Sequence, residues 1–407
     1  MLKLLKRAKR LFKKINFFLN SAFRRLFSEK IDLLIYDDIY PHPISGFRFE
    51  EFTILLKEFK KSKIIVNPTA YGIIGTPVSE HKKHIFNIIQ QHPELKHKLI
   101  HNTKNIDNAK IFYCVFLSNI LKNLSWLEKH NIPFVFTLYP GGGFEVNDEE
   151  SDARLKKIFK SSSFHKVIVT QDYTRKYLLE KKFCEESDMT FIFGCVVPQK
   201  NIGVSTNNKL TYLLNKNTFD ICFCAAKYTN NRKDKGYNVF IDFAHNLSKK
   251  FDLVRFHVIG GYDKNDIDIR LIEEKIKFYG YQDFEDLKKI FLYIDVIVSP
   301  NKPYVINKGA FDGFPLGTVI EAALNGVVAI VSDPLKQNNV FIDKQELIII
   351  NAEISSIEKE VISLIENPEL LYSISEKGQK KFSEVYSNVV QMNPRIELLR
   401  NKILNYD

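Results

Sequence analysis

The segment Gly309-Ala-Phe-Asp-Gly-Phe-Pro-Leu-Gly-Thr-Val-Ile-Glu-Ala-Ala-Leu-Asn-Gly326 says more about the architecture than any other part of the chain. Its first half holds too much glycine and proline for a helix. Its second half predicts a helix from Thr318 to Leu324, with Thr318 as the N-cap and Gly326 just beyond the end. The short β-branched run Val327–Val331 follows directly and predicts a strand buried on both faces.

A glycine-rich loop that leads into a helix presents free backbone N–H groups, and the helix dipole adds positive potential there. Such a place suits a phosphate or a diphosphate. Glu321 lies one turn further along, where a carboxylate can accept hydrogen bonds from the hydroxyls of a ribose. The segment therefore predicts a site for a nucleotide with a diphosphate. The alternative is an ordinary loop before a helix, with Glu321 on a solvated face.

This segment resembles the donor-binding motif of the retaining glycosyltransferases called group 1 or family 4, which have the two-domain GT-B fold. That motif has two acidic residues separated by seven positions, whereas Asp312 and Glu321 have eight residues between them, and the leading acid is Asp. The resemblance implies Glu321 at the ribose and Asp312 at the sugar. It also implies that the donor contacts the loop residues Gly313, Phe314, Leu316, Gly317 and Thr318.

The rest of the chain fits two α/β domains. Its 407 residues suffice for two cores, and its composition, 45% apolar and 26% charged, is ordinary for a soluble globular protein. Strands are predicted at 31–36, 63–66, 111–116, 134–138, 166–170 and 189–193, and again at 219–224, 254–259, 276–279, 296–298, 327–331 and 347–350. Helices are predicted at 49–61, 81–91, 117–130, 150–159, 174–182, 236–250, 284–293, 318–324, 357–365, 369–386 and 394–404.

These patterns predict an α/β protein of the GT-B type, with two Rossmann-like domains and a cleft between the carboxyl ends of their strands. A polar stretch, 198–217, separates the sets, so we expect an acceptor-side domain at 31–200 and a donor domain at 218–390. By resemblance, which covers roughly 31–390, a C-terminal helix within 391–407 would cross back to the first domain.

The region after the first strand of the donor domain resembles the family's basic pair, an Arg and a Lys that hold the departing diphosphate. Lys227 stands at the Arg position and Lys235 at the Lys position, with Arg232 as an alternative cation. A leaving diphosphate gains charge in the transition state, and fixed cations lower that cost. The other interpretation is a solvated lysine loop. Further along, the resemblance places Tyr281 beside the nucleotide base.

Two glycine-containing loops are candidates in the first domain. By resemblance the loop 41–48 faces the donor phosphate and the acceptor, with Gly46 at the donor and His42 and Arg48 on the acceptor side. The triple glycine 141–143 allows a close backbone approach to a ligand, so Gly142 is expected at the donor. Many family members have a His near the reacting sugar where this chain has Tyr139, which leaves that contact to the phenol or to backbone. His42 as a turn residue and the glycines as a mobile turn are the alternatives.

Residues 1–30 carry ten Lys or Arg and one acidic residue, which accounts for +9 of the net charge of +11. Their apolar residues occupy roughly 140° of a helical wheel and the basic residues most of the rest. This predicts a basic amphipathic helix suited to an anionic membrane surface, while docking on the protein itself, partner binding and nucleic-acid binding are alternatives. The remaining body is nearly neutral (11 − 9 = +2), which argues against a nucleic-acid partner. No apolar run approaches the ~20 residues that span a bilayer.

Five scattered cysteines have no metal-ligand spacing and indicate a reducing compartment, and we expect no metal site. The resemblance implies a cytoplasmic glycosyltransferase, peripheral on the inner membrane face, that acts in cell-surface polysaccharide synthesis. It would move a hexose-type sugar from a nucleoside diphosphate sugar to a hydroxyl of a lipid-linked or polysaccharide acceptor, with retention and without a cofactor. Rival hypotheses are a nucleotide-sugar epimerase or hydrolase of the same fold, and a non-catalytic module that binds a nucleotide sugar or a membrane.

Overall fold

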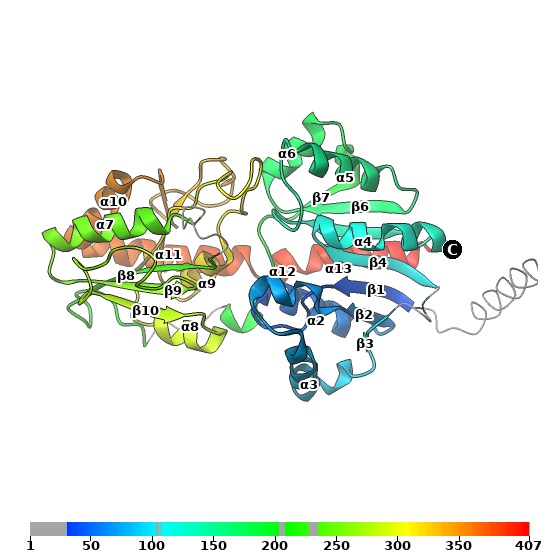
Figure 1. The fold of residues 1–407 in the computed structure, drawn as a ribbon, viewed down its shortest axis with the longest axis horizontal. Helices are drawn as coiled ribbons and strands as arrows, with labels where there is room; N and C mark the ends of the chain where they lie inside the picture. The colour runs from blue at the N-terminus through cyan, green and yellow to red at the C-terminus, as the bar shows by residue number, and fades with distance from the viewer. Residues whose placement is uncertain (1–30, 103–105, 107, 203–207, 228–234, 407) are drawn as a thin grey trace, which may run out of the picture.

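The computed structural model describes residues 31–102, 106, 108–202, 208–227 and 235–406. The expectations about the helix at 1–30 and about Arg232 fall outside these residues. The described chain forms two lobes that lie side by side, each built on a parallel sheet (Figure 1).

The first domain has a seven-stranded parallel sheet in the order β3-β2-β1-β4-β5-β6-β7. Helices α4, α5 and α6 cover one face, and α2, α3 and the C-terminal α13 cover the other. The strands are β1 (Ile31–Asp37), β2 (Ser62–Val66), β3 (Leu99–Ile100), β4 (Ala109–Val115), β5 (Phe134–Leu138), β6 (Phe164–Val169) and β7 (Met189–Phe191). The helices are α2 (Gly46–Glu58), α3 (His81–Gln91), α4 (Leu117–His130), α5 (Glu149–Phe159), α6 (Asp172–Glu180) and α13 (Asn393–Leu404).

The second domain has a six-stranded parallel sheet in the order β10-β9-β8-β11-β12-β13. Helices α7 and α10 pack on one face and α8 and α9 on the other, and α11 contributes to both cores. The strands are β8 (Phe219–Ala225), β9 (Val254–Gly260), β10 (Ile276–Gly280), β11 (Val296–Ser299), β12 (Val328–Ser332) and β13 (Ile348–Ile350). The helices are α7 (Tyr237–Lys250), α8 (Phe284–Phe291), α9 (Gly317–Leu324), α10 (Ile354–Glu366) and α11 (Pro368–Val385).

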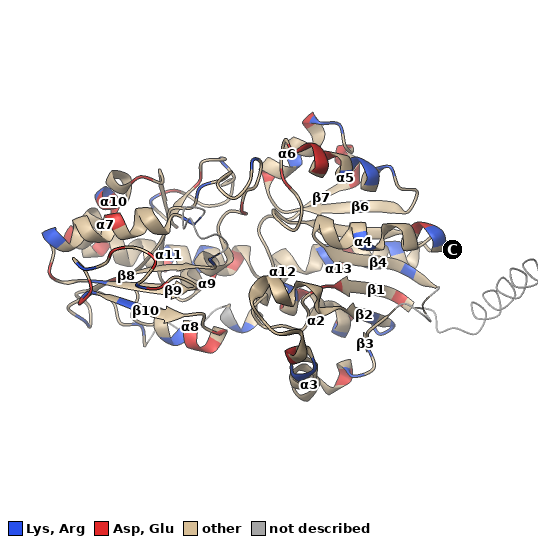
Figure 2. Cartoon of the chain, in the orientation of Figure 1, with Lys and Arg blue, Asp and Glu red and all other residues tan. Residues whose placement is uncertain are grey.

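The apolar strands explain why both sheets are buried. All of β1 except Asp32 is buried, and so are all seven residues of β8, as expected for parallel strands covered by helices on both faces. Surface helices show the complementary pattern. Helix α5 begins with acidic residues and ends with Lys156 and Lys157, which suits the helix dipole (Figure 2). The prediction of two Rossmann-like α/β domains is confirmed.

The predicted start of α9 is wrong. The helix begins at Gly317, with Leu316 as the N-cap, and the hydroxyl of Thr318 donates a hydrogen bond to the carbonyl of Cys224 at 2.8 Å. That side chain therefore ties α9 to β8 instead of capping its own helix. The end is as predicted, because Gly326 takes a left-handed φ of 72° just beyond the helix.

The chain end runs from the second domain back to the first (Figure 1). Helices α11, α12 (Asn388–Gln391) and α13 follow one another, and α13 lies against β1 and β4. Arg395 of α13 is fully buried, with its Nε 3.5 Å from a carboxylate oxygen of Glu51. Burial raises the pKa of Glu51, and the nearby Arg395 opposes that rise. A buried ion pair thus anchors α13 in the first domain.

A second connection is the strap, which we define as residues 301–311 of the loop between β11 and α9. Phe311 leaves its own domain and packs in the core of the first, with ring centroids 5.7 Å from Phe144 and 5.3 Å from Tyr173. The backbone N–H of Val146 donates to the carbonyl of Gly309 at 3.0 Å. Figure 1 shows the strap as the yellow loop that reaches the first domain beside α6. The strap thus connects the second domain to the first through Phe311 and Gly309.

Candidate functional site

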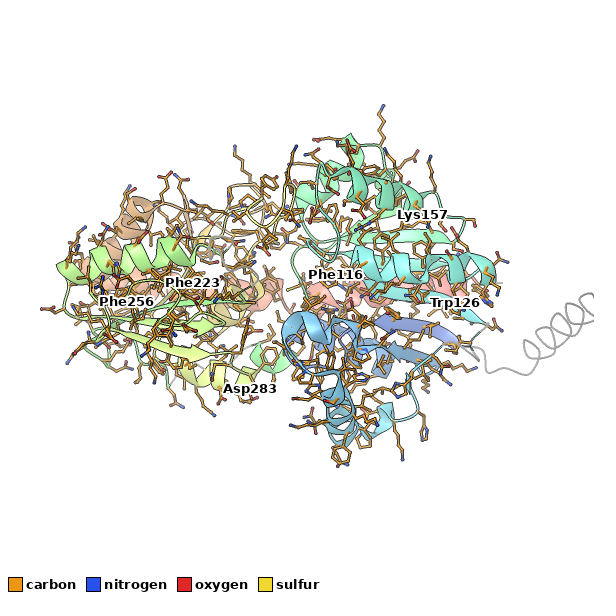
Figure 3. All side chains as sticks on the ribbon, in the orientation of Figure 1. Phe116, Trp126, Lys157, Phe223, Phe256 and Asp283 are labelled. Carbon is orange, nitrogen blue, oxygen red and sulfur yellow. The ribbon has the colours of Figure 1, made fainter. Side chains whose placement is uncertain are left out.

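The candidate site lies where the carboxyl ends of the second sheet face the first domain. In this sheet the strand order reverses between β8 and β11, which is where ligands bind in open α/β sheets. The loops after β8, β9, β11 and β12 start from these strand ends, and the long loop after β11 leads into α9. Figure 3 shows Phe116 of the first domain and Asp283 of the second at the facing ends of the two lobes.

Lys235 and Asp312, two of the predicted residues, meet between the loops that follow β8 and β11. The ammonium of Lys235 lies 2.5 Å from Oδ2 of Asp312, and the Lys235 side chain is only 4% exposed. The amide of Asn301 donates to the same oxygen at 2.9 Å. Gly236, which caps α7 with a φ of 73°, allows the chain to pass here, because a Cβ would lie 2.3 Å from the carbonyl oxygen of Pro300. The site therefore holds a buried cation paired with a partly exposed carboxylate.

Lys227 points to a different partner. Its ammonium lies 2.6 Å from a carboxylate oxygen of Asp266, and its backbone N–H donates to the hydroxyl of Tyr281 at 3.4 Å. Tyr281 is 58% exposed, and its hydroxyl lies over Gly261, 2.7 Å from where a Cβ would stand. Lys227 and Tyr281 thus form one rim of the site, apart from the Lys235–Asp312 pair.

The donor loop is held by its apolar residues. Phe314 is buried in the core of the second domain, and Leu316 packs partly against it. Asp312 and Leu316, the residue just before α9, line the same pocket, so Asp312 lies close to the start of this helix. The first N–H groups of any helix lack partners within the helix, so Gly317 and Thr318 begin an anion-binding terminus.

Glu321 lies one turn into α9 and is partly exposed. Among the described residues its carboxyl group has no hydrogen bond or ion pair, and burial raises its pKa to about 8. Hydroxyl donors would stabilise the carboxylate form and lower this pKa. The geometry therefore suits the predicted contact with a ribose.

Gly46 of the first domain contacts Phe284 of the second domain. A Cβ added to Gly46 would lie 2.1 Å from the Phe284 ring, so α8 of the second domain closes directly on the first turn of α2. The expected contact between Gly46 and a donor phosphate is therefore not formed here, because the ring of Phe284 takes that place.

His42 and Arg48 are committed to the first domain. His42 accepts from the backbone N–H of Ile44 at 3.1 Å, its Nε2 lies 3.1 Å from the Thr76 hydroxyl, and burial beside His84 lowers its pKa to about 4. Arg48 donates to Asp38 at 2.7 Å and to Asp37 at 3.2 Å. Both side chains hold the loop after β1 in place, so their expected contacts with an acceptor are not supported.

Tyr139 also turns away from the site. Its hydroxyl donates to Glu51 at 3.3 Å and accepts from Arg395 at 3.3 Å, and the residue is 6% exposed. Of the two predicted alternatives, the phenol contact is therefore corrected, and only a backbone contact remains. The reason is the buried Glu51–Arg395 pair, whose second partner lies 256 residues further along the chain.

The triple glycine 141–143 has a conformational explanation. All three residues have positive φ, at 81°, 57° and 86°. A Cβ on Gly142 would lie 2.5 Å from the ring of Phe116, and its carbonyl accepts from the N–H of Ser118 at 2.9 Å. Glycine is therefore required by the backbone and by Phe116, whether or not a donor approaches.

Three functional candidates have no sequence motif. The amides of Gln171, Asn301 and Gln337 each donate to the segment Asp312–Phe314. They come from the start of α6, the strap and the loop after β12, so only the fold brings them together. A pocket beside them is lined by Asn301, Gln337, Asp312 and Gly313, with Pro303, Pro315 and Pro334.

Within the described ranges no group of three or more His, Cys, Asp or Glu side chains is arranged to hold a metal ion. In the same ranges no helix is both long enough and apolar enough to cross a membrane.

Known proteins resemble the second domain in sequence and nearly the whole chain in fold. Residues 223–381 match the family model described as "Glycosyl transferases group 1". No curated protein matches the chain. Among solved structures, a glycosyltransferase from Rickettsia africae superposes with a TM-score of 0.63 at 16% identity, covering 93% of this chain and 100% of that one.

Two further structures cover nearly the whole chain. HepE from Anabaena, crystallised with UDP and glucose, has a TM-score of 0.60 at 13% identity and covers 91% of this chain and 100% of its own. Sucrose-phosphate synthase from Thermosynechococcus elongatus has a TM-score of 0.60 at 12% identity, covering 91% and 99%. The chain thus has the GT-B fold, and residues 223–381 of its second domain are similar to the group 1 glycosyltransferases.

Proposed function

We propose that this glycosyltransferase moves a hexose-type sugar from a nucleoside diphosphate sugar to a hydroxyl of a lipid-linked or polysaccharide acceptor in cell-surface glycan synthesis. The observation that carries the proposal is the ion pair of the buried Lys235 with Asp312, which lines one pocket with the residue before α9, and the Glu321 carboxyl one turn into that helix. Solved neighbours support the choice of donor, since HepE was crystallised with UDP-glucose and TarM with UDP and α-GlcNAc-glycerol.

Donor binding exchanges the partner of Lys235. The negative diphosphate competes with Asp312 for the ammonium group, and the N–H groups at the start of α9 share its charge. Asp312 then keeps the amide donor of Asn301 and gains room to accept a hydrogen bond from a sugar hydroxyl. One ion pair thus links diphosphate binding to sugar binding.

Ribose binding uses Glu321. In the free protein the raised pKa keeps most of this carboxyl protonated at neutral pH. Two hydroxyl donors stabilise the carboxylate, so nucleotide binding drives off the proton. Tyr281, exposed at the rim beside Lys227, offers a ring face for the base.

The transfer step breaks the bond between the anomeric carbon and the diphosphate oxygen and forms a bond from that carbon to the acceptor oxygen. The acceptor proton passes to the leaving phosphate oxygen, so no protein base is required. We propose retention of configuration and no requirement for a metal ion, with Lys235 stabilising the charge that develops on the diphosphate. Arg232 and Lys227 are the further cations proposed for this role.

The test is a donor-consumption assay on the purified chain and on the variant Lys235→Ala/Glu321→Ala. A glycosyltransferase consumes donor in proportion to acceptor, and the double variant loses that activity. Consumption without acceptor would point to an epimerase or hydrolase. An intact cellular function in the double variant would overturn the enzyme proposal in favour of a binding module.

For residues 1–30 we propose attachment to an anionic inner membrane surface, which places the enzyme on the cytoplasmic side near a lipid-linked acceptor. The support is the +9 charge and the apolar stripe of this segment. Flotation with anionic vesicles compares the full chain with a chain that starts at Ser28. Equal binding by both would refute the membrane role.

A further inference from the structure

Three buried or half-buried amides surround the donor loop. Gln171 of the first domain donates through Nε2 to the carbonyl of Phe314 at 3.4 Å. Asn301 donates through Nδ2 to Oδ2 of Asp312 at 2.9 Å, and Gln337 donates through Nε2 to the backbone carbonyl of Asp312 at 3.1 Å. One short segment of backbone and one carboxylate thus receive three amide N–H donors from three elements.

These contacts fix which end of each amide is which. Every nitrogen faces an oxygen acceptor, so exchanging the two ends would place oxygen against oxygen. The opposite ends, Gln171 Oε1, Asn301 Oδ1 and Gln337 Oε1, are buried and accept no hydrogen bond from any described residue. Gln171 is 3% exposed and Gln337 is 5% exposed. A buried acceptor without a donor costs about as much as a lost hydrogen bond, so the three oxygens call for donors from a ligand.

These three amides differ from other buried amides because they converge on one segment, the donor loop. Asn119 and Asn325 also have buried oxygens without a partner, but each lies alone in a helix or at its end. Asn301 and Gln337 instead line one pocket together with Asp312 and Gly313. Gln171 approaches the same segment from the first domain, with its Nε2 only 3.1 Å from where a Cβ of Gly313 would stand.

We propose that Gln171, Asn301 and Gln337 recognise hydroxyl groups of the transferred sugar and select a neutral sugar over a uronic acid. The inference rests on the proposed function and deepens it. Amide oxygens accept hydrogen bonds, which hydroxyls supply and a carboxylate does not. A uronate would face three acceptor oxygens and Asp312 while Lys235 is engaged by the diphosphate.

Gln171 also makes sugar recognition depend on how the two domains are placed relative to each other. It belongs to the first domain, whereas the loop that it contacts belongs to the second. All three amides therefore surround the sugar only when the domains are closed as they are here. Sugar recognition is thus coupled to the geometry that brings the acceptor side to the donor.

The experiment measures dissociation constants of the full chain for UDP, UDP-glucose and UDP-glucuronate by calorimetry. The variants are Gln171→Leu and Gln337→Leu. Asn119→Leu is the matched control, because it removes a buried amide with an unpartnered oxygen away from the donor loop. The quantity compared is the ratio of the constants for UDP-glucose and UDP, which cancels general effects on the nucleotide site.

We expect each Gln variant to shift this ratio against UDP-glucose by about three- to tenfold, with UDP binding and the control ratio unchanged. We also expect wild type to bind UDP-glucuronate at least about tenfold more weakly than UDP-glucose. An unchanged ratio in both Gln variants, equal loss of UDP binding, or tight UDP-glucuronate binding would overturn the proposal. If GDP or ADP binds in place of UDP, GDP-mannose or ADP-glucose replaces UDP-glucose. No binding of any nucleotide would overturn the proposed function, and this inference with it.

Discussion

Lys235 is buried against Asp312, in a turn that only glycine at position 236 allows. Asp312 and Glu321 could be predicted from the sequence because the residues of their motif lie close together along the chain. The roles of His42, Arg48 and Tyr139 could not be predicted, because each side chain is held by partners that no local sequence pattern reveals. Asp37 and Asp38 hold Arg48, Thr76 holds His42, and Arg395 reaches Tyr139 from the far end of the chain.

Replacement of the buried lysine tests its role at the diphosphate. We expect Lys235→Ala to lower the transfer rate by about 10²–10³, the usual effect of losing one group that stabilises developing charge. Lys302→Ala, an exposed lysine on the strap, is the control and should change the rate less than twofold. The measurement is the transfer rate at saturating donor. Equal rates in wild type and Lys235→Ala would show that this residue has no role in the transfer step.

The raised pKa of Glu321 predicts proton release. Near pH 7 a group with a pKa of about 8 is mostly protonated, and ribose hydroxyls should ionise it on binding. Calorimetry of nucleotide binding in buffers of different ionisation enthalpy should show nearly one proton released by wild type and none from this source in Glu321→Gln. Identical release by both proteins would contradict the assignment.

The same group affects stability. Its folded pKa lies above the usual 4.5, so the folded state binds the proton more tightly than the unfolded state. This stabilisation is present below about pH 4.5 and is lost as the pH rises toward 8. Glu321→Gln should therefore gain stability relative to wild type across that window in urea unfolding, by up to roughly 5 kcal/mol at pH 8. A constant difference between the two proteins would contradict the raised pKa.

At the scale of elements, strongly periodic segments were predicted well. Helices α3 and α4 have the predicted limits, because their apolar spacing is unambiguous. The two-residue β3 and the short α12 lack enough residues for a pattern. The strap could not be predicted either, since Phe311 packs in the core of the other domain. The start of α9 differed because Thr318 bonds to β8 across the sheet.

The strap gives a prediction about domain coupling. Phe311→Ala removes a ring that is 6% exposed, and we expect a loss of about 3 kcal/mol in unfolding free energy. Small-angle scattering should also show a larger radius of gyration, because the two domains separate. Tyr304→Phe removes only an exposed hydroxyl contact with Tyr173 and should cost about 0.5 kcal/mol or less. Unchanged scattering and stability in Phe311→Ala would show that the strap does not hold the domains.

Helix α13 depends on its buried ion pair. Arg395→Ala leaves Glu51 buried without its cation, with an expected loss of about 3–5 kcal/mol. The pKa of Glu51 is already raised by burial, so the loss should shrink as the pH falls toward the usual carboxyl range and protonates it. Melting curves across pH test this, and Glu51→Gln in the Arg395→Ala background should recover part of the stability. A pH-independent loss would contradict the account.

For the whole molecule, the alternation of strands and helices was enough to predict two Rossmann-like domains, because the central strands are buried on both faces and the connections are long enough for helices. The alternation does not predict how the two domains contact each other. Phe284 against Gly46, Gln171 against the donor loop and the strap in the first core all depend on the interface between the two domains. The amides that we assign to sugar recognition belong to this level, which is why no motif indicated them.

The most direct test of the donor site is a thermal-shift panel of the purified chain with UDP, GDP, CMP and ADP, each with and without EDTA, in wild type and in Lys235→Ala/Glu321→Ala. A ligand at ~100 times its dissociation constant should stabilise the folded state by about 2.7 kcal/mol. We predict a shift with one nucleoside diphosphate that EDTA does not change and that the double variant loses. No shift with any nucleotide, or an equal shift in the double variant, would contradict the donor site described for this chain.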